Sequence, residues 1–249
     1  MTTTQESPTT PAENDLQRGF IVPGDPDLVI YPELEQGSEF WLQARRGIVT
    51  ASVVGKLLSP SLKVSDNETS RGITLTLAAE RITGEVEYMH PTFDMQRGHD
   101  DEPVARDIYA EHFAPVDEIG FMTRDFGGFV IGYSPDGMVG TDGLIEIKSR
   151  KPKVHLKTIL DGKPPAENMA QLMTGLLISG RAWIDYCSFS AGLPFWTVRV
   201  YPDPAWFAAI IAAAEAYETN VADVIRCYNT ETKGLPLTER RIEIEDLTF

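Results

Sequence analysis

Two acids and a lysine, Asp136, Glu146 and Lys148, have the residue types and spacing best suited to chemistry in this sequence. Asp136 lies in Tyr133-Ser134-Pro135-Asp136-Gly137, where the proline and glycine predict a tight turn. The segment Leu144-Ile145-Glu146-Ile147-Lys148 predicts a strand, in which alternating side chains place Glu146 and Lys148 on one face. Two carboxylates converging from a turn and a strand form an oxygen-rich pocket suited to Mg²⁺ or Mn²⁺.

Such a pocket is suited to phosphodiester hydrolysis. A bound divalent cation lowers the pKa of a water molecule and stabilises charge on the phosphate, while Lys148 would orient the water and offset negative charge. The simpler alternative is that Asp136-Gly137 is an ordinary turn and that Glu146 and Lys148 lie on a solvated strand face. The Pro-Asp pair upstream and the β-structure on both sides favour the catalytic interpretation.

The surrounding elements alternate between helical and strand character, which predicts an α/β fold with a central mixed β-sheet flanked by helices. Strands are expected at residues 121–126, 129–133, 144–148, 183–190 and 195–201. Helices are expected at residues 102–113, 169–177 and 205–227. In the first of these helices Pro103 is acceptable within the first turn. Met169, Leu172, Met173, Leu176 and Leu177 form one apolar stripe, so Gln171 faces away from it.

The 249 residues, 42% hydrophobic and 24% charged, are typical of a single globular domain. We expect the domain at residues 21–228, a disordered N-terminal tail at 1–20 that is poor in apolar residues, and a C-terminal extension at 229–249. No apolar run approaches the roughly 20 residues that span a bilayer. The sequence therefore predicts a soluble, cytoplasmic protein with no membrane partner. Cys187 and Cys227 are expected to be buried and are too few to ligate an iron–sulfur cluster.

The formal charge of −15 argues against a partner as negative as DNA. This objection weakens if the DNA contacts are confined to a local basic groove, if carboxylates hold cations, or if an oligomer gathers its basic patches. Net charge bears on non-specific binding and not on the chemistry of one site.

Four ordered motifs resemble the Pro-Asp…(Asp/Glu)-x-Lys nuclease superfamily and, within it, the lambda exonuclease (YqaJ-type viral recombinase) family. The motifs are Trp41-Leu42-Gln43-Ala44-Arg45 with Thr50-Ala51-Ser52, then Gly98-His99-Asp100-Asp101-Glu102, then Ser134-Pro135-Asp136-Gly137 with Glu146-Ile147-Lys148, and finally Met169-Ala170-Gln171. The resemblance covers about residues 38–227. It implies a restriction-endonuclease-like core and 5′→3′ degradation of one strand of a DNA duplex, leaving a 3′ single strand for phage recombination.

The resemblance also implies a role for each matching residue. Asp136, Glu146 and the carbonyl of Ile147 would bind Mg²⁺, and Lys148 would be catalytic. Glu102 and Gln171 would support the catalytic groups, and Arg45 and Ser52 would bind the 5′-terminal phosphate. Duplex DNA ends, a single-strand annealing protein and a homotrimer are the implied partners, in a bacterial host cell if the chain is phage-encoded.

Several alternatives remain open at this point. An endonuclease of the same superfamily would cleave closed circular duplex, which an exonuclease leaves intact. A catalytically silent DNA-end-binding module would bind a linear duplex without digesting it. The segment after the predicted catalytic strand, with Lys151, Lys153, His155 and Lys157, is either a loop that contacts the DNA backbone or a solvated loop. His90, His99, His112 and His155 show no metal-ligand spacing.

Overall fold

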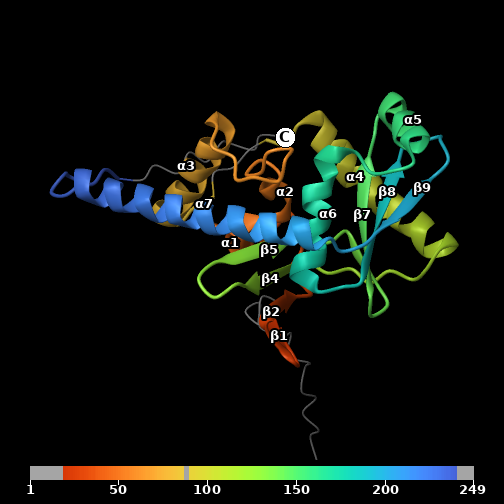
Figure 1. The fold of residues 1–249 in the computed structure, drawn as a ribbon, viewed down its shortest axis with the longest axis horizontal. Coiled ribbons are helices and arrows are strands. Elements are labelled where there is room, and N and C mark those ends of the chain that lie inside the picture. Colours follow the sequence, from red (N-terminus) through yellow and green to blue (C-terminus); the bar gives the residue numbers. More distant parts are fainter. Residues whose placement is uncertain (1–18, 87–89, 240–249) are drawn as a thin grey trace, which may run out of the picture.

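The computed structural model describes residues 19–86 and 90–239, and Figure 1 shows how their helices and strands are arranged. The strands are β1 (Phe20–Val22), β2 (Asp25–Tyr31), β3 (Val49–Thr50), β4 (Phe121–Asp125), β5 (Val130–Tyr133), β6 (Gly137–Val139), β7 (Gly143–Ser149), β8 (Trp183–Phe189) and β9 (Trp196–Val200). The helices are α1 (Glu39–Arg45), α2 (Ala51–Val54), α3 (Glu68–Thr83), α4 (Phe93–His112), α5 (Pro152–Asp161), α6 (Ala166–Ser179) and α7 (Pro204–Glu231).

The strands form two sheets, one of five strands in the order β1-β2-β4-β5-β3 and one of four in the order β6-β7-β8-β9. Each sheet is mixed, because β3 pairs with β5 and β7 with β8 in parallel, while the other pairs are antiparallel. The α/β fold class with mixed sheets and flanking helices is confirmed. The strands are divided between two sheets rather than joined in one, because the chain changes sheet between β5 and β6.

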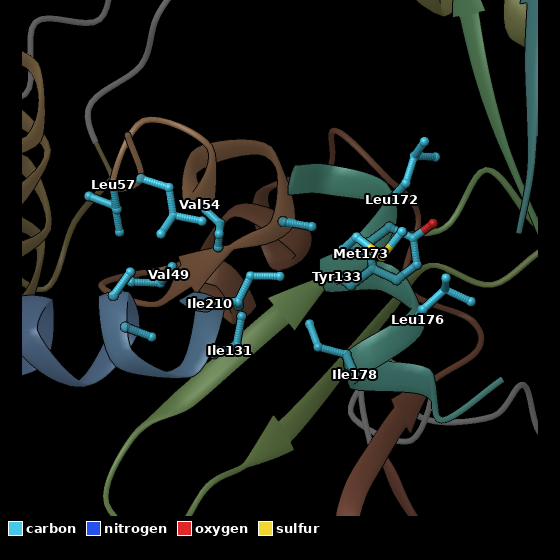
Figure 2. Packing of buried hydrophobic residues seen from close by; sticks show 14 of the residues in the cluster. Val49, Val54, Leu57, Ile131, Tyr133, Leu172, Met173, Leu176, Ile178 and Ile210 are labelled. Carbon is cyan, nitrogen blue, oxygen red and sulfur yellow. The ribbon is translucent and has the colours of Figure 1, made fainter. Parts of the chain in front are cut away.

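Helix α6 connects the two sheets, since it packs against β4 and β5 of one and β8 of the other. Its apolar stripe buries Leu172, Met173 and Leu176, and Figure 2 shows these side chains beside Tyr133 of β5. Burial of such side chains is the main favourable term in folding. The helix ends at Gly180, whose φ of 69° is the left-handed conformation that glycine adopts without strain. The predicted helical stripe is confirmed.

Helix α4 packs against β7 and β8, where Ala105 and Tyr109 pack with Ile145, Ile147 and Cys187 in a second hydrophobic cluster. The sequence predicted a helix only from Glu102, with Pro103 in its first turn. The observed helix begins at Phe93 with Thr92 as its N-cap, so Pro103 lies in its interior. The prediction of the helix start was wrong because a proline in a helix interior is normally disfavoured.

Two other expectations are corrected. The segment containing Lys151 to Lys157 forms helix α5, with Pro152 in its first turn, rather than a loop. Its His155 is buried and contacts the Ser188 hydroxyl at 2.8 Å. Cys187 is buried as expected, whereas Cys227 is exposed because it lies on the outer part of the long helix α7.

The boundaries of the predicted domain are not tested. Residues 1–18 and 240–249, in the predicted tails, lie outside the described residues. At the C-terminal boundary, α7 continues to Glu231, beyond the helix predicted to end at residue 227. No helix within residues 19–86 and 90–239 is both long and apolar enough to cross a membrane.

Candidate active site

Glu146 lies at the centre of the candidate site, on β7, and its side chain is fully buried. Its Oε1 accepts hydrogen bonds from Lys148 Nζ at 2.5 Å and from Gln171 Nε2 at 2.5 Å. Its Oε2 accepts a hydrogen bond from the Tyr133 hydroxyl at 3.0 Å. A buried carboxylate is stable only when it is paired and hydrogen-bonded, and three side chains from β5, β7 and α6 satisfy this requirement.

Asp136 lies in the turn where the chain passes from β5 to β6. Its Oδ2 accepts the Ile147 N–H at 2.6 Å, which places the carboxylate beside β7 just beyond Ile145, the last residue of β7 that pairs with β6. Burial raises the pKa of Asp136 well above its usual range, and the neighbouring carboxylates of Glu146 and Glu102 raise it further. Two carboxylates that repel each other in a partly dehydrated site would be stabilised by a nearby cation.

Lys148 supplies part of that positive charge. Burial alone would lower the pKa of Lys148, but the carboxylates of Glu146 and Asp136 outweigh this effect and raise it. The ammonium group therefore stays protonated and serves as a hydrogen-bond donor and a fixed positive charge. The shared strand face predicted for Glu146 and Lys148 is confirmed by their direct contact.

Glu102 reaches the same region from α4, but its direct partner is Arg106, one helical turn further along. Burial raises the pKa of Glu102, opposed by Arg106 and reinforced by Glu146. Arg106 also donates from Nε to the carbonyl of Asp136 at 2.8 Å and pairs with Glu118 at 2.8 Å. Arg106 thus connects α4 to the turn that carries Asp136, and beside it lies a hollow of about 330 Å³ that Glu102 and Asp136 help to line.

The donor set suits a hard divalent cation. Within residues 19–86 and 90–239 no three His, Cys, Asp or Glu side chains form a metal-binding group, so two carboxylates need a further oxygen ligand. The N–H and C=O of one residue leave an extended strand on the same side, so the Ile147 carbonyl faces the edge occupied by Asp136. Asp136, Glu146 and this carbonyl are all oxygen donors, the kind that Mg²⁺ prefers.

A second group of polar side chains lies around Arg45 at the end of α1. Its guanidinium stacks over the Trp41 ring at 3.9 Å and donates to the Thr50 hydroxyl at 3.4 Å. Thr50 in turn contacts the exposed hydroxyl of Ser52 at 3.2 Å. Burial lowers the pKa of Arg45 to about 10, partly offset by Glu80, and no carboxylate of the described residues forms an ion pair with it. This cation is available to an anionic ligand.

The two groups are connected. Trp41 Nε1 donates to the Ser134 hydroxyl at 2.9 Å, and Gln36 Nε2 donates to the Pro135 carbonyl at 3.2 Å. Both acceptors lie in the turn that carries Asp136. The structure therefore brings the predicted metal-binding and catalytic residues into one group, with Arg45 and Ser52 beside this group and not within it. The members of the group are Asp136, Glu146, Ile147, Lys148, Gln171 and Glu102.

Sequence reasoning missed four residues of the site, namely Gln36, Tyr133, Ser134 and Arg106. Tyr133 and Ser134 adjoin the Pro-Asp pair but had been assigned only to a strand end and a turn. Arg106 lies four residues after Glu102, the helical spacing at which opposite charges form pairs. That spacing was a usable signal for the ion pair, whereas the bond to the Asp136 carbonyl depends on the tertiary fold.

The fold and this constellation define a restriction-endonuclease-like nuclease core. The comparisons agree: the profile of the YqaJ-like viral recombinase domain matches residues 40–182. An alkaline exonuclease (LHK-Exo) from Laribacter hongkongensis is 32% identical, with a TM-score of 0.70 over 80% of this chain and 100% of the other. The chain belongs to the YqaJ-like viral recombinase domain family and is a nuclease of the recombination type.

The same alkaline exonuclease has also been solved in complex with dAMP. A phage-related exonuclease from Haemophilus somnus 129PT is 15% identical, with a TM-score of 0.54 over 73% of this chain and 96% of the other, which bears on the fold alone. No curated protein sequence matches the chain significantly.

Proposed function

We propose that this chain is a Mg²⁺-dependent 5′→3′ exodeoxyribonuclease that resects one strand of linear duplex DNA and leaves a 3′ single strand for recombination. The observation that carries the proposal is the cluster of Asp136, Glu146 and Lys148, with the polar group around Arg45 connected to it through Trp41 and Ser134. A nuclease centre beside a cation without a carboxylate partner suits a strand end that carries a terminal phosphate.

Asp136, Glu146 and the Ile147 carbonyl would hold the cation, with Mn²⁺ as a substitute. When bound, the cation supplies a water of lowered pKa and stabilises charge on the scissile phosphate. Lys148 holds its proton and offsets negative charge that develops during cleavage. Tyr133 and Gln171 hold Glu146 in one orientation, so the carboxylate does not have to reorganise during the reaction.

The polarity is supported by the position of the polar group around Arg45. Arg45 and Ser52 would bind the 5′-terminal phosphate, and the next phosphate along the strand would lie at the catalytic group. Cleavage there releases a nucleoside 5′-monophosphate. The 32%-identical alkaline exonuclease accommodates dAMP, a product of that chemical class.

Digestion of a linear duplex labelled separately at each 5′ and 3′ end, in Mg²⁺ and in chelator, tests this function. We expect early release of the 5′ label alone, abolished by chelator, and no cleavage of closed circular duplex. Early release of the 3′ label would refute the polarity, and cleavage of the circle would identify an endonuclease. Binding without any digestion would identify a silent end-binding module.

The remaining partners are also part of the proposal. We propose that the chain assembles as a homotrimer and passes its 3′ single strand to a single-strand annealing protein in the host cytoplasm. Sedimentation analysis of the purified protein tests the assembly, and a monomer at micromolar concentration would contradict it.

A further inference from the structure

Arg150 follows the catalytic strand and continues its alternation of side chains. The backbone N–H of Arg150 donates to the Phe189 carbonyl at 2.8 Å, so the β7–β8 ladder extends one residue beyond Ser149. Side chains two apart on a strand share a face, which places Arg150 in line with Glu146 and Lys148. Its contact with Tyr186, the cross-strand partner of Glu146, agrees with this placement.

The partners of Arg150 hold it without neutralising it. Its Nη2 donates to Asn168 Oδ1 at 2.5 Å, and the Tyr186 hydroxyl lies 3.4 Å away. Asn168 and Tyr186 are themselves buried, so these contacts restrict where the guanidinium can lie. No carboxylate in the described residues forms an ion pair with it, although arginine remains charged in proteins.

The Nε atom of Arg150 is buried without a hydrogen-bond partner, the only such side-chain atom within residues 19–86 and 90–239. Leaving a buried donor unsatisfied costs about 1–3 kcal/mol, and more when the group is charged. Such a group calls for a specific explanation. Arg150 is only partly buried, so a ligand oxygen can approach its Nη atoms and offset the charge that the protein leaves uncompensated, and a phosphate oxygen is the matching acceptor in a nuclease.

Resting on the function proposed above, we infer that Arg150 binds the phosphate on the 3′ side of the scissile phosphate in the strand being degraded. Two residues of a strand advance about 6.6 Å, on the scale of the separation between successive phosphates of one nucleic acid strand. If the scissile phosphate lies at Lys148, the next phosphate falls at Arg150.

The position of Arg45 decides whether Arg150 lies on the 5′ or the 3′ side of the scissile phosphate. Arg45 reaches the catalytic turn through Trp41 and Ser134, on the side of the five-stranded sheet. Arg150 lies beyond Lys148 on the four-stranded sheet. A strand whose 5′ phosphate is bound by Arg45 therefore passes the catalytic group first and reaches Arg150 afterwards.

This contact is tested by a double-mutant cycle in which one change is made in the protein and the other in the DNA substrate. The probe is a 5′-phosphorylated linear duplex with a neutral methylphosphonate at the second linkage, one position 3′ of the scissile one. In single-turnover release of the first nucleotide, we expect this change to slow the wild type about 10- to 100-fold. Arg150→Met should slow the unmodified duplex similarly and should not respond further to the methylphosphonate. An equal response in both proteins would overturn the inference.

Arg226→Met is the matched control, since it removes one positive charge from the exposed outer part of α7. Its response to the methylphosphonate should equal that of the wild type. If Arg150→Met fails to fold, Arg150→Gln replaces it, because a glutamine keeps a donor for Asn168 without the charge. A methylphosphonate at the fifth linkage controls for neutralisation of the strand in general.

Binding measured in chelator separates this inference from the proposed function. Loss of one phosphate contact should reduce the slope of log K against log salt by about 0.9 in Arg150→Gln, but not in Arg226→Met. A wild type that binds but releases no nucleotide in Mg²⁺ would refute the exonuclease function, while this change in slope would still show the contact. An unchanged slope together with an active wild type would refute the Arg150 contact alone.

Discussion

Two buried carboxylates on neighbouring strands, Glu146 on β7 and Asp185 on β8, show how differently one sheet can use the same group. Asp185 accepts from Arg199 through both oxygens, at 2.8 and 2.9 Å, and from the Tyr109 hydroxyl at 2.6 Å. Its charge is balanced within the protein. Glu146 instead shares its lysine with Asp136, so the charges of its surroundings do not balance without a ligand.

The two tryptophan-stacked arginines repeat the contrast. Arg199 lies 3.4 Å from the Trp183 ring and is paired with Asp185. Arg45 lies 3.9 Å from the Trp41 ring, and its guanidinium donates to the Thr50 hydroxyl without an ion pair to a carboxylate of the described residues. These comparisons show that a structural ion pair differs from a ligand-binding group less in burial than in pairing. In the structural pair every charge is matched within the protein, whereas a ligand-binding group has a charge that is not.

The largest expected effect is the loss of turnover on changing the catalytic group. Glu146→Gln and Lys148→Ala should each lower single-turnover cleavage about 10³-fold or more while DNA binding is retained. Cleavage and binding of a labelled duplex in Mg²⁺ measure both quantities. Turnover like that of the wild type in either variant would remove these residues from the catalytic mechanism.

Asp185→Asn should show the opposite behaviour, a loss of stability without a loss of chemistry. Removing the partner of Arg199 should lower the free energy of unfolding by about 2–3 kcal/mol. This is less than for a fully buried pair, because 42% of the Arg199 side chain is exposed. Urea denaturation measures the change, and cleavage per folded molecule should stay within about twofold. A defect in turnover at unchanged stability would contradict the comparison.

Arg45→Ala tests the unpaired arginine. We expect the preference for 5′-phosphorylated over 5′-hydroxyl ends to fall about tenfold or more, because the charge that binds the terminal phosphate is lost. Cleavage rates on both ends give the ratio, and Arg226→Met serves as a control of equal charge. A preference that remains at the wild-type value would refute the role of Arg45 in binding the terminal phosphate.

The smallest effect is on the pH dependence of stability in chelator. Because the pKa of Asp136 is raised in the folded protein, the folded state retains a proton that the unfolded chain loses above pH about 4. The free energy of unfolding contributed by this group therefore falls as pH rises. Asp136→Asn should gain stability relative to the wild type between pH 5 and pH 8. If urea denaturation gave free energies of unfolding that changed with pH in parallel for both proteins, the raised pKa of Asp136 would be refuted.

Strand β7 was predictable because the pattern that specifies it is local in the sequence. Alternation placed Glu146 and Lys148 together, and helical periodicity turned Gln171 away from the apolar stripe, with no long-range contact required. The start of α4 was not predictable from Pro103, since the packing of Ala105 and Tyr109 against β7 and β8 outweighs the local cost of the proline.

The supporting contacts depend on tertiary structure. The bond from Trp41 to Ser134 spans 93 residues of sequence, and that from Arg106 to the Asp136 carbonyl spans 30. Neither leaves a periodic pattern in the chain. Division of the strands into two sheets was missed for the same reason, because it is decided by which strands pair and not by where each strand lies.

Residues 134–136 are the passage between the two sheets, with β5 on one side and β6 on the other. Asp136 therefore lies in the connection between the two sheets. Its distance from Glu146 is maintained only while both sheets keep their register. A fluctuation that loosens either sheet would separate Asp136 from Glu146 well below the temperature at which the whole protein unfolds. Cleavage activity should consequently decline on heating before the unfolding transition, and hydrogen exchange at the Ile147 amide should report the same opening.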